Sequence, residues 1–413
     1  MQKITLKEYQ REIVKKGYQV LVEFGILYLS MEVRTGKTIV SLSIAEIMNA
    51  RRVLFVTKKM AIESVLKDFR ASGFEYMLKV INYEALEKLN GAETFDFIIV
   101  DEAHSLGAYP KPSLRTQRLK EIVGAKPLIL LSGTPTPEGY SQIYHQFWIH
   151  DHSPFMMYKN FYKWAKEYVH VRERMINGYR INDYSRADEK KVRKDMDHLF
   201  ISFTQQEAGF EGTVEEEILT VPMSENIHTL SNILVNERYY KMRDGREIVC
   251  DTAAKLKTKL HQIYSGTVIT EDGELKILDK SKADFIRNKY RGRKIAIFYL
   301  FQAEGQLLKE TFPMWTNSPE EFNSEDEYVF ISQIQSGSMG TNLSSADVIV
   351  FYNIHYASLL YWQARARSQH MHRKENSVIN WIFSENGIEA DIYKAVIKKK
   401  DYTTSYFRRS YLR

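Results

Sequence analysis

The chain has 413 residues, enough for two to three domains, and its 44% hydrophobic and 27% charged residues are typical of a globular protein with a buried core. Its single cysteine, Cys250, excludes an internal disulfide framework and a zinc site built from several cysteines. The 58 basic and 52 acidic side chains leave a net charge of +6, which is compatible with a polyanionic partner without requiring one.

The first long apolar run, residues 20–31, contains Glu23 and is too short to span a bilayer, so no membrane association is predicted. A charged stretch from Lys3 to Lys16 precedes it, and the cleavage pattern of a signal peptide is missing. Together with the single cysteine, these features predict a reducing, cytoplasmic compartment.

The first 150 residues alternate short apolar runs with amphipathic stretches. Strands are predicted at residues 25–30, 53–57, 97–100 and 128–131, with helices between them, for example at 38–49 and 61–69. Strand and helix in this rhythm indicate a parallel sheet covered on both faces, which we place in a first lobe of residues 1–150.

The last 130 residues repeat this rhythm. Strands are predicted at 294–300, 328–332, 348–352 and 378–383, in a second lobe of residues 280–413 that ends in a basic tail. Residues 151–279 show mainly helical periodicity and carry 19 basic against 22 acidic side chains, whereas both ends of the chain are mildly basic. The predicted fold class is therefore α/β, with two parallel-sheet lobes and a mainly helical insertion between them.

The strongest chemical signal is Arg34-Thr35-Gly36-Lys37-Thr38, between a predicted strand and a predicted helix. In a phosphate loop, backbone N–H groups and the helix dipole face the phosphates, Lys37 supplies a positive charge, and the Thr38 hydroxyl can coordinate Mg²⁺. The first glycine of the usual pattern is replaced by Met31. The alternative is an ordinary helix N-terminus with a surface lysine.

Asp101-Glu102-Ala103-His104 directly follows the apolar run 97–100, so the acids project from the carboxyl end of a buried strand. There Asp101 can hold Mg²⁺ while Glu102 orients or deprotonates an attacking water. An acidic pair at this place is also a common helix N-cap. The phosphate loop 64 residues upstream favours the catalytic interpretation.

Ser132-Gly133-Thr134-Pro135 follows the strand predicted at 128–131. Small hydroxyl residues at a strand end suit a hydrogen-bonded relay that couples two parts of a site, and a plain turn is the alternative.

These three elements, in this order, resemble the superfamily 2 helicase and translocase ATPases, with Asp101 to His104 as the DEAH box. Residues 6–10, Leu-Lys-Glu-Tyr-Gln, look like the family's adenine-reading motif, in which Gln10 would hydrogen-bond the base. The strand and loop at 53–58 are placed like the family's contact with a nucleic-acid backbone, which implies that role for Thr57 and Lys58.

Two further motifs of the family have counterparts in the second lobe. Residues 337–347 are similar to the fifth motif, which implies that Gly340 and Asn342 bind nucleotide. Residues 363–367 resemble the sixth, which implies coupling through Gln363 and an arginine finger at Arg367. The second arginine of that motif is replaced by His370, so His370, or Arg373 three residues further on, is a candidate to assist.

The run from Leu343 to Asn353 looks specifically like the Swi/Snf-type branch, in the compact form that many bacteriophages encode. The resemblance implies two RecA-like lobes with ATP and Mg²⁺ in the cleft and a nucleic acid crossing both. Thr38 and Asp101 would hold the metal. A glycine is common where this chain has Arg34, so the arginine side chain must point away from the phosphates. The implied nucleotide-binding residues are Gln10, Arg34, Thr35, Gly36, Lys37, Thr38, Gly340, Asn342, Arg367 and His370.

Two segments are candidates for additional nucleic-acid contacts. Residues 158–166 mix basic and aromatic side chains, and a helix there would place its aromatic residues on one face, as core in preference to a base-stacking platform. Lys163 would then face phosphates or solvent. In the tail, Lys398 and Lys399 would add salt-sensitive phosphate affinity, with a solvated terminus as the alternative.

The first hypothesis is an ATP-driven translocase on DNA, double-stranded or branched in preference to RNA, that remodels DNA or displaces bound proteins. The second is a strand-separating helicase on DNA or RNA. The third is a catalytically silent nucleic-acid-binding subunit that works with a nuclease or recombination partner protein. If the chain is phage-encoded, its compartment is the cytoplasm of the bacterial host.

Overall fold

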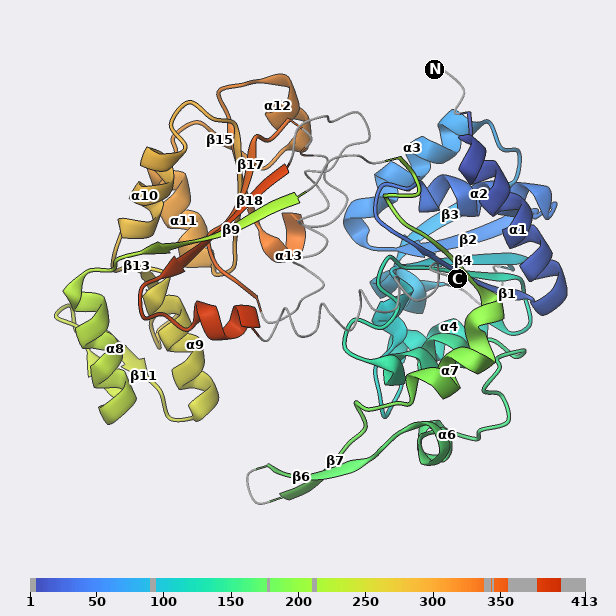
Figure 1. Ribbon diagram of the computed structural model, residues 1–413, viewed down its shortest axis with the longest axis horizontal. Helices are drawn as coiled ribbons and strands as arrows, with labels where there is room; N and C mark the ends of the chain where they lie inside the picture. The colour runs from blue at the N-terminus through green and yellow to red at the C-terminus, as the bar shows by residue number, and fades with distance from the viewer. Residues whose placement is uncertain are drawn as a thin grey trace. The chain divides into compact units, whose positions relative to one another are not determined.

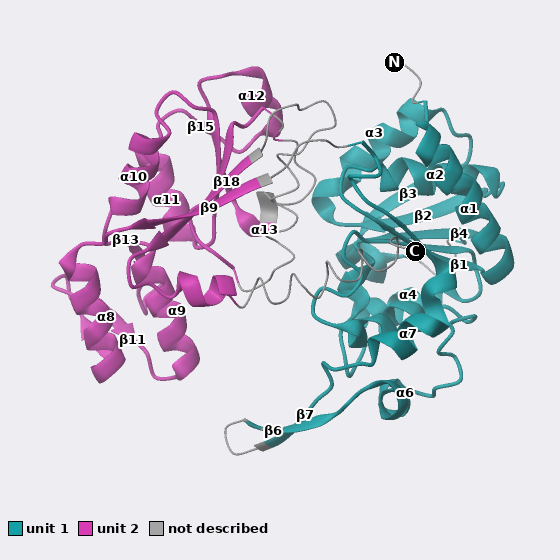
Figure 2. Ribbon diagram, viewed as in Figure 1, with its two compact units in different colours: residues 1–209, 399–413 teal, residues 210–398 magenta. Residues whose placement is uncertain are grey.

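The computed structural model describes residues 5–89, 94–176, 179–209, 214–337, 343, 345–355 and 377–394. These residues form two compact units, unit 1 up to Gly209 and unit 2 from Val214 onward (Figure 2). This division differs from the predicted one into residues 1–150, 151–279 and 280–413. Residues 151–209 fold with unit 1 because their aromatic side chains enter its core, and residues from 214 onward fold with unit 2 because their first strand joins its sheet.

Unit 1 is built on a six-stranded sheet in the order β3-β2-β4-β5-β1-β8, with every pair parallel. The four strands predicted for this lobe are confirmed, as is the parallel sheet. The strands are β1 (Ile26–Met31), β2 (Arg52–Thr57), β3 (Met77–Asn82), β4 (Phe97–Asp101), β5 (Leu128–Leu131) and β8 (Phe200–Phe203).

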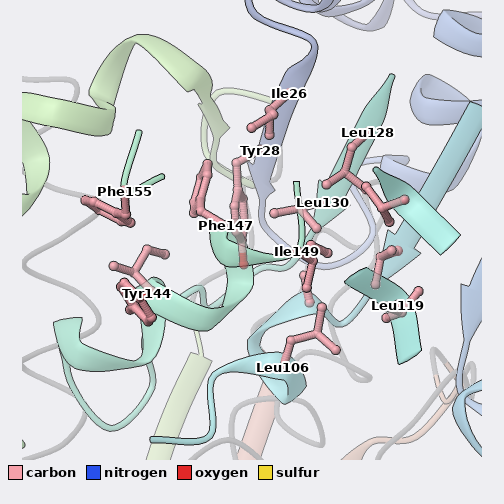
Figure 3. Close-up of a cluster of buried hydrophobic side chains, with 14 of the residues drawn as sticks. Ile26, Tyr28, Leu106, Leu119, Leu128, Leu130, Tyr144, Phe147, Ile149 and Phe155 are labelled. Atoms are coloured by element: carbon pink, nitrogen blue, oxygen red, sulfur yellow. The ribbon is translucent and has the colours of Figure 1, made fainter. Parts of the chain in front are cut away.

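Both faces of this sheet are buried, because successive side chains of a strand point to opposite sides. In β1, Ile26 and Tyr28 belong to one hydrophobic cluster, and Leu27 and Leu29 belong to the other. Figure 3 shows part of the first cluster, in which aromatic side chains around Phe147 pack against Tyr28. A strand with no polar face explains the near-continuous apolar runs in the sequence.

Helices cover the two faces of the sheet (Figure 1). The α-helices of unit 1 are α1 (Glu8–Phe24), α2 (Lys37–Ile47), α3 (Ile62–Ser72), α4 (Leu114–Val123), α5 (Ile143–Trp148), α6 (Phe161–Tyr168) and α7 (Glu189–Met196). Short 3₁₀ turns are η1 (Lys59–Ala61), η2 (Tyr83–Lys88), η3 (Ala103–Leu106), η4 (Tyr140–Gln142) and η5 (Asp197–Leu199).

One hairpin of unit 1 stands apart from the sheet. Strands β6 (Arg172–Ile176) and β7 (Tyr179–Asp183) pair antiparallel with each other in a sheet of two strands. They extend from the body of the unit beside α6 (Figure 1). The sequence-based prediction of a mainly helical middle segment did not include this hairpin.

Unit 2 holds a second six-stranded sheet, in the order β15-β16-β14-β17-β18-β9, and again every pair is parallel. The prediction of two parallel-sheet lobes is therefore confirmed. The strands are β9 (Val214–Val221), β14 (Ile295–Tyr299), β15 (Trp315–Thr316), β16 (Val329–Gln333), β17 (Val348–Phe351) and β18 (Ser377–Ser384). The associated helices are α10 (Ser281–Lys289), α11 (Gln302–Thr311), α12 (Pro319–Ser324) and α13 (Ile334–Gly337).

A small module with its own hydrophobic cluster lies within unit 2, between β9 and α10. It combines two helices with two antiparallel ribbons, where the sequence predicted mainly helix. Its elements are α8 (Glu225–Glu237), β10 (Tyr239–Lys241), β11 (Glu247–Val249), α9 (Ala253–Tyr264), β12 (Thr267–Ile269) and β13 (Leu275–Ile277).

Buried polar groups join this module to the sheet of unit 2. His261 Nε2 of α9 lies 2.5 Å from Asn353 Oδ1, and Asn353 Nδ2 donates to Glu304 Oε1 at 2.6 Å. Close to them, the fully buried ammonium of Lys282 forms an ion pair of 3.2 Å with the fully buried carboxylate of Glu389. Among the residues that the structure describes, no helix is long and apolar enough to cross a membrane.

Candidate functional site

The predicted motif segments of the first lobe converge at one edge of its sheet. The phosphate loop follows β1, Thr57 ends β2, Asp101 ends β4, and Ser132 follows β5. These four strands are neighbours in the order β2-β4-β5-β1 and all run parallel, so their carboxyl ends lie side by side. This edge is where open α/β sheets bind ligands.

The phosphate loop has a backbone that favours glycine at two positions. Arg34 has φ 64° and Gly36 has φ 89°, both in the left-handed region. A Cβ at position 36 would lie 2.2 Å from Gln10 Nε2, so this position has no room for a side chain. Arg34 therefore has a backbone conformation that a glycine would adopt with less strain.

The side chains of the loop hold its shape from within. Thr35 is fully buried and its hydroxyl donates to Glu32 O at 2.7 Å. Lys37 opens α2, and its Nζ donates to Met31 O at 2.8 Å and to Glu32 O at 3.1 Å. The ammonium of Lys37 is thus held across the loop, at the positive end of the α2 dipole.

The first turn of α1 packs against this loop. Gln10 accepts from Lys7 N at 2.9 Å through Oε1 and donates to Thr35 O at 3.3 Å through Nε2. Tyr9 also donates to Thr35 O, at 3.1 Å, and its ring stacks on Phe203 at 4.6 Å between centroids. Gln10 therefore lies at the phosphate loop, with its amide used in part to hold that loop, and its reading of adenine stays a prediction.

Asp101 is a half-buried acid whose carboxylate is held by several hydrogen bonds. Its carboxylate accepts from Thr57 Oγ1 at 2.8 Å and from Glu102 N at 3.0 Å, and its backbone carbonyl accepts from the Tyr83 hydroxyl. Burial and the neighbouring Glu102 raise the pKa of Asp101, while the Thr57 hydrogen bond and the charge of Lys37 oppose the rise. The effect of Lys37 places its ammonium within electrostatic reach of Asp101.

Thr57 is fully buried, and its hydroxyl is used by Asp101. The structure therefore places this side chain against Asp101 in the interior, instead of on the surface where a nucleic-acid backbone would pass. The next residue, Lys58, is half-buried.

A chain of close polar contacts links the acidic motif to the segment after β5. His104 Nδ1 lies 3.4 Å from Glu102 Oε2 and 2.9 Å from Ser132 Oγ, and Ser132 Oγ accepts from Thr134 N at 3.1 Å. Burial lowers the pKa of His104 to about 3, so its ring is neutral at neutral pH. A Cβ on Gly133 would come within 3.3 Å of Met31 O, which brings this segment against the start of the phosphate loop.

Oxygen donors for a divalent cation are present at this edge. The Asp101 carboxylate has lone pairs beyond those that accept from Thr57 and Glu102, and the Thr38 hydroxyl is on the first turn of α2. A carboxylate and a hydroxyl are hard ligands of the kind that Mg²⁺ takes together with waters and substrate phosphates. These residues therefore fit Mg²⁺.

Several predicted residues lie elsewhere. Lys163 is exposed on α6, whose aromatic face is buried in the unit 1 core, as the sequence favoured. The remaining predictions fall outside the described residues, and they are Gly340, Asn342, Gln363, Arg367, His370, Lys398 and Lys399.

Sequence reasoning missed two groups that hold the site. Tyr83 binds the backbone of Asp101, and Gln205 binds the phosphate loop through Glu32 Oε2 at 2.7 Å and Val33 O at 3.0 Å. Gln205 is 172 positions away from Val33 in the chain, and no pattern in the sequence connects them.

The chain is similar in sequence to curated helicases of fungi. It is 26% identical over 165 residues to helicase swr1 of Schizosaccharomyces pombe, a match that covers 33% of this chain and 13% of that protein. It is 31% identical over 101 residues to helicase SWR1 of Saccharomyces cerevisiae, which covers 22% of this chain and 7% of that protein. The similarity thus spans a small part of the length of these relatives.

Two further comparisons add little to the sequence similarity. Among solved structures, the Sulfolobus solfataricus SWI2/SNF2 ATPase core in complex with dsDNA aligns at a TM-score of 0.45 and 15% identity, over 97% of this chain and 92% of that chain. No protein-family model matches the chain. The matches to the Swr1 helicases agree with the order of the motifs, which resembles that of the superfamily 2 ATPases.

Proposed function

We propose that this chain is an ATP-dependent translocase on DNA, double-stranded or branched, that couples ATP hydrolysis to movement and to the remodelling of DNA or of protein–DNA complexes. The observation that carries the proposal is the arrangement at the carboxyl edge of the unit 1 sheet. There the Lys37 ammonium, the half-buried Asp101 carboxylate and the chain from Glu102 through His104 to Ser132 lie together.

The proposed reaction is hydrolysis of the bond between the β- and γ-phosphates. Backbone N–H groups at the start of α2 and the Lys37 ammonium bind the phosphate oxygens. Glu102 orients the attacking water and takes its proton as the bond to the γ-phosphorus forms, while the bridging oxygen leaves with ADP. Mg²⁺, held by Asp101 and Thr38, supplies charge neutralisation at the phosphates when it is bound.

The roles proposed for residues of the second lobe rest on the family resemblance alone. Arg367 is proposed as the finger that stabilises the charge on the γ-phosphate, with His370 or Arg373 assisting and with Gly340 and Asn342 at the nucleotide. In related chemistry an arginine finger increases the rate by about 10³–10⁵. If hydrolysis depends on that finger, the hydrolysis of each ATP is coupled to a movement of one lobe against the other.

DNA is proposed as the track because of the Swi/Snf-like run from Leu343 to Asn353, the similarity to proteins named helicases and the net charge of +6. Lys58 and Lys163 are proposed contacts with its backbone, with Lys398 and Lys399 adding affinity from the tail. A nuclease or recombination partner, a phage origin and a place in the host cytoplasm are proposed on the resemblance only.

The test is ATP hydrolysis by the purified chain with single-stranded, double-stranded and branched DNA and with RNA. We expect duplex or branched DNA to stimulate hydrolysis strongly, and Glu102→Gln to abolish it. Displacement of a third strand from a triplex without unwinding of a forked duplex is the expected activity. Unwinding of the fork would favour the strand-separating helicase, and hydrolysis that no nucleic acid stimulates would overturn the proposal. Unchanged DNA binding and function in Lys37→Ala would point to the silent subunit.

A further inference from the structure

Among the described residues, the β6–β7 hairpin pairs with no third strand, and it exposes much of its surface to solvent. We call residues 170–176 and 179–186 the arm. Its ladder pairs Arg172 with Asp183 and Met175 with Arg180, and β6 and β7 form a two-stranded sheet of their own. With about 3.3 Å per residue, the strand from Tyr168 to the end of β6 reaches about 25 Å. In Figure 1 the arm extends from unit 1 next to α6.

The base of the arm is fixed firmly. Val169 and Ala187 form a bridge at the root, and both are buried in the unit 1 core. Next to them, the Tyr168 ring stacks on Trp164 at 5.0 Å and its hydroxyl donates to Asp195 Oδ2 at 2.5 Å. The arm is therefore held in a defined direction by the core of unit 1.

Beyond this base the arm exposes apolar and basic side chains together. Met175 is 66% exposed and Ile181 is 46% exposed. The two side chains lie on opposite faces of the ribbon, because Met175 pairs with Arg180, the residue next to Ile181 in β7. Arg172 and Arg180 are exposed beside them, and Arg180 forms a long ion pair of 3.9 Å with Glu173. A free-standing two-stranded hairpin is at best marginally stable in water, so exposed apolar side chains along it call for a binding partner.

The charge of the arm and of the helix before it indicates what that partner is. Residues 159–186 contain seven basic and three acidic side chains, a net charge of +4 in a chain whose total is +6. On α6, Lys163 and Lys166 are exposed, whereas Glu167 is paired with Lys191 at 3.4 Å. Basic side chains are thus in excess on this projection.

We propose that the arm is a DNA-contacting element that lies along a groove of the duplex, with Arg172 and Arg180 at the phosphates and with the face that carries Met175 toward the edges of bases or sugars. A two-stranded ribbon fits the major groove of B-DNA, which is about 12 Å wide. Arginines on both strands would neutralise phosphates, and apolar side chains along a ribbon suit base steps and thymine methyl groups. The inference rests on the proposed function, since it takes duplex DNA as the substrate.

The first experiment measures duplex affinity as a function of salt for Arg172→Gln/Arg180→Gln. Each lost phosphate contact lowers the slope of log K against log salt by about 0.9, so we expect a slope lower by about 2 and an affinity at least about tenfold weaker. The matched control is Lys15→Gln/Lys16→Gln, which removes the same charge from exposed positions on α1 of the same unit. ATP hydrolysis without DNA should be equal in both variants and the wild type, because none of the four residues lies at the nucleotide site.

A second experiment attaches a label to an introduced cysteine. This is practical because the single native cysteine, Cys250, is buried. In Met175→Cys, a photo-crosslinker attached to the new thiol should react with bound duplex DNA. The control is Val22→Cys on α1, at a position 61% exposed, where we expect crosslinking at background level.

The two proposals fail in different ways. If DNA does not stimulate hydrolysis by the wild type, the proposed function is wrong. If DNA stimulates the wild type but Arg172→Gln/Arg180→Gln binds duplex with the affinity and salt slope of Lys15→Gln/Lys16→Gln, the arm does not contact DNA. Equal crosslinking from positions 175 and 22 would overturn the inference independently.

Discussion

The imidazole of His104 and the hydroxyl of Ser132 lie 2.9 Å apart, and this contact joins the acidic motif after β4 to the turn after β5. On one side of it His104 lies near Glu102, and on the other Ser132 binds Thr134 N. A change in the position of Glu102 can therefore reach the segment after β5 through the side chains of His104 and Ser132.

Ser132→Ala should separate hydrolysis from movement. The substitution removes the partner of a buried imidazole, and we expect a loss of about 1–3 kcal/mol in the free energy of unfolding. We also expect fewer third strands displaced from a triplex for each ATP hydrolysed. The comparison is Ser43→Ala, because the buried Ser43 hydroxyl donates to Ile39 O of its own helix at 2.7 Å. A ratio of displacement to hydrolysis equal to that of Ser43→Ala would contradict a coupling role.

Thr57→Val should shift the acid limb of the pH profile of kcat/KM upward. The Thr57 hydroxyl stabilises the ionised form of Asp101, whose pKa burial already raises. Without that hydrogen bond the pKa of Asp101 rises further, so activity is lost at a higher pH as the pH falls. Thr57→Ser retains the hydroxyl and should keep the wild-type profile. A lower kcat/KM with an unmoved acid limb would show that Thr57 only supports the fold.

Stability should fall on acidification below about pH 6.5 because the fold buries neutral histidines. Burial lowers the pKa of His104 to about 3 and that of His145, His150 and His261 to about 4. The unfolded chain binds these protons from its ordinary pKa of about 6.5 downward, whereas the fold binds them only near the lowered values. Between pH 6.5 and the lowered pKa, each histidine therefore lowers the free energy of unfolding by up to about 1.4 kcal/mol per pH unit.

Urea unfolding at pH 7.5 and pH 5.5 measures this loss. In His145→Gln, the free energy of unfolding should fall less between pH 7.5 and pH 5.5 than in the wild type. The contribution of one histidine is missing, because glutamine does not titrate. An identical difference in wild type and variant would show that His145 is not kept neutral by the fold.

Lys282→Met should be among the most destabilising single changes in unit 2. It leaves the fully buried Glu389 carboxylate without its cation, 3.2 Å away in the wild type, and breaking a buried pair from one side costs about 3–5 kcal/mol. The double variant Lys282→Met/Glu389→Gln should recover part of that loss, since the uncompensated charge is gone. In Lys280→Met, where the lysine is exposed, urea unfolding should change little. A double variant no more stable than Lys282→Met would argue against the buried charge as the cause.

The sequence predicts the strands of this protein well where they lie inside a sheet. Runs such as 97–100 and 128–131 are buried on both faces, so their pattern is unbroken and local. Strand β3 is half-exposed at the edge of the sheet, and β8 is short and half-buried, so neither has the pattern of a buried strand. The β6–β7 hairpin was missed for a related reason, because neither of its faces is covered by the core.

The site residues, like the strands, could be predicted where they adjoin strands buried inside the sheet. Lys37, Asp101, Glu102 and Ser132 each end a buried strand or follow it, and the order of neighbouring strands brings them together. Tyr83 and Gln205 could not be predicted, because each reaches the site through a backbone hydrogen bond whose partner is set by the folded chain. The boundary between the units was also misplaced relative to the structure, since the aromatic face of α6 belongs to the first core and β9 to the second sheet.

Strand β8 pairs in parallel with β1, from Tyr28 opposite Phe200 to Met31 opposite Phe203. The polypeptide therefore passes through α6 and the arm and then returns to flank the strand that leads into the phosphate loop. A protease that cuts within the arm would produce two pieces on a denaturing gel, yet the pieces would stay associated through this pairing and migrate together in gel filtration. Molecules cut in this way would keep the sheet around β1 folded, although their chain is no longer continuous.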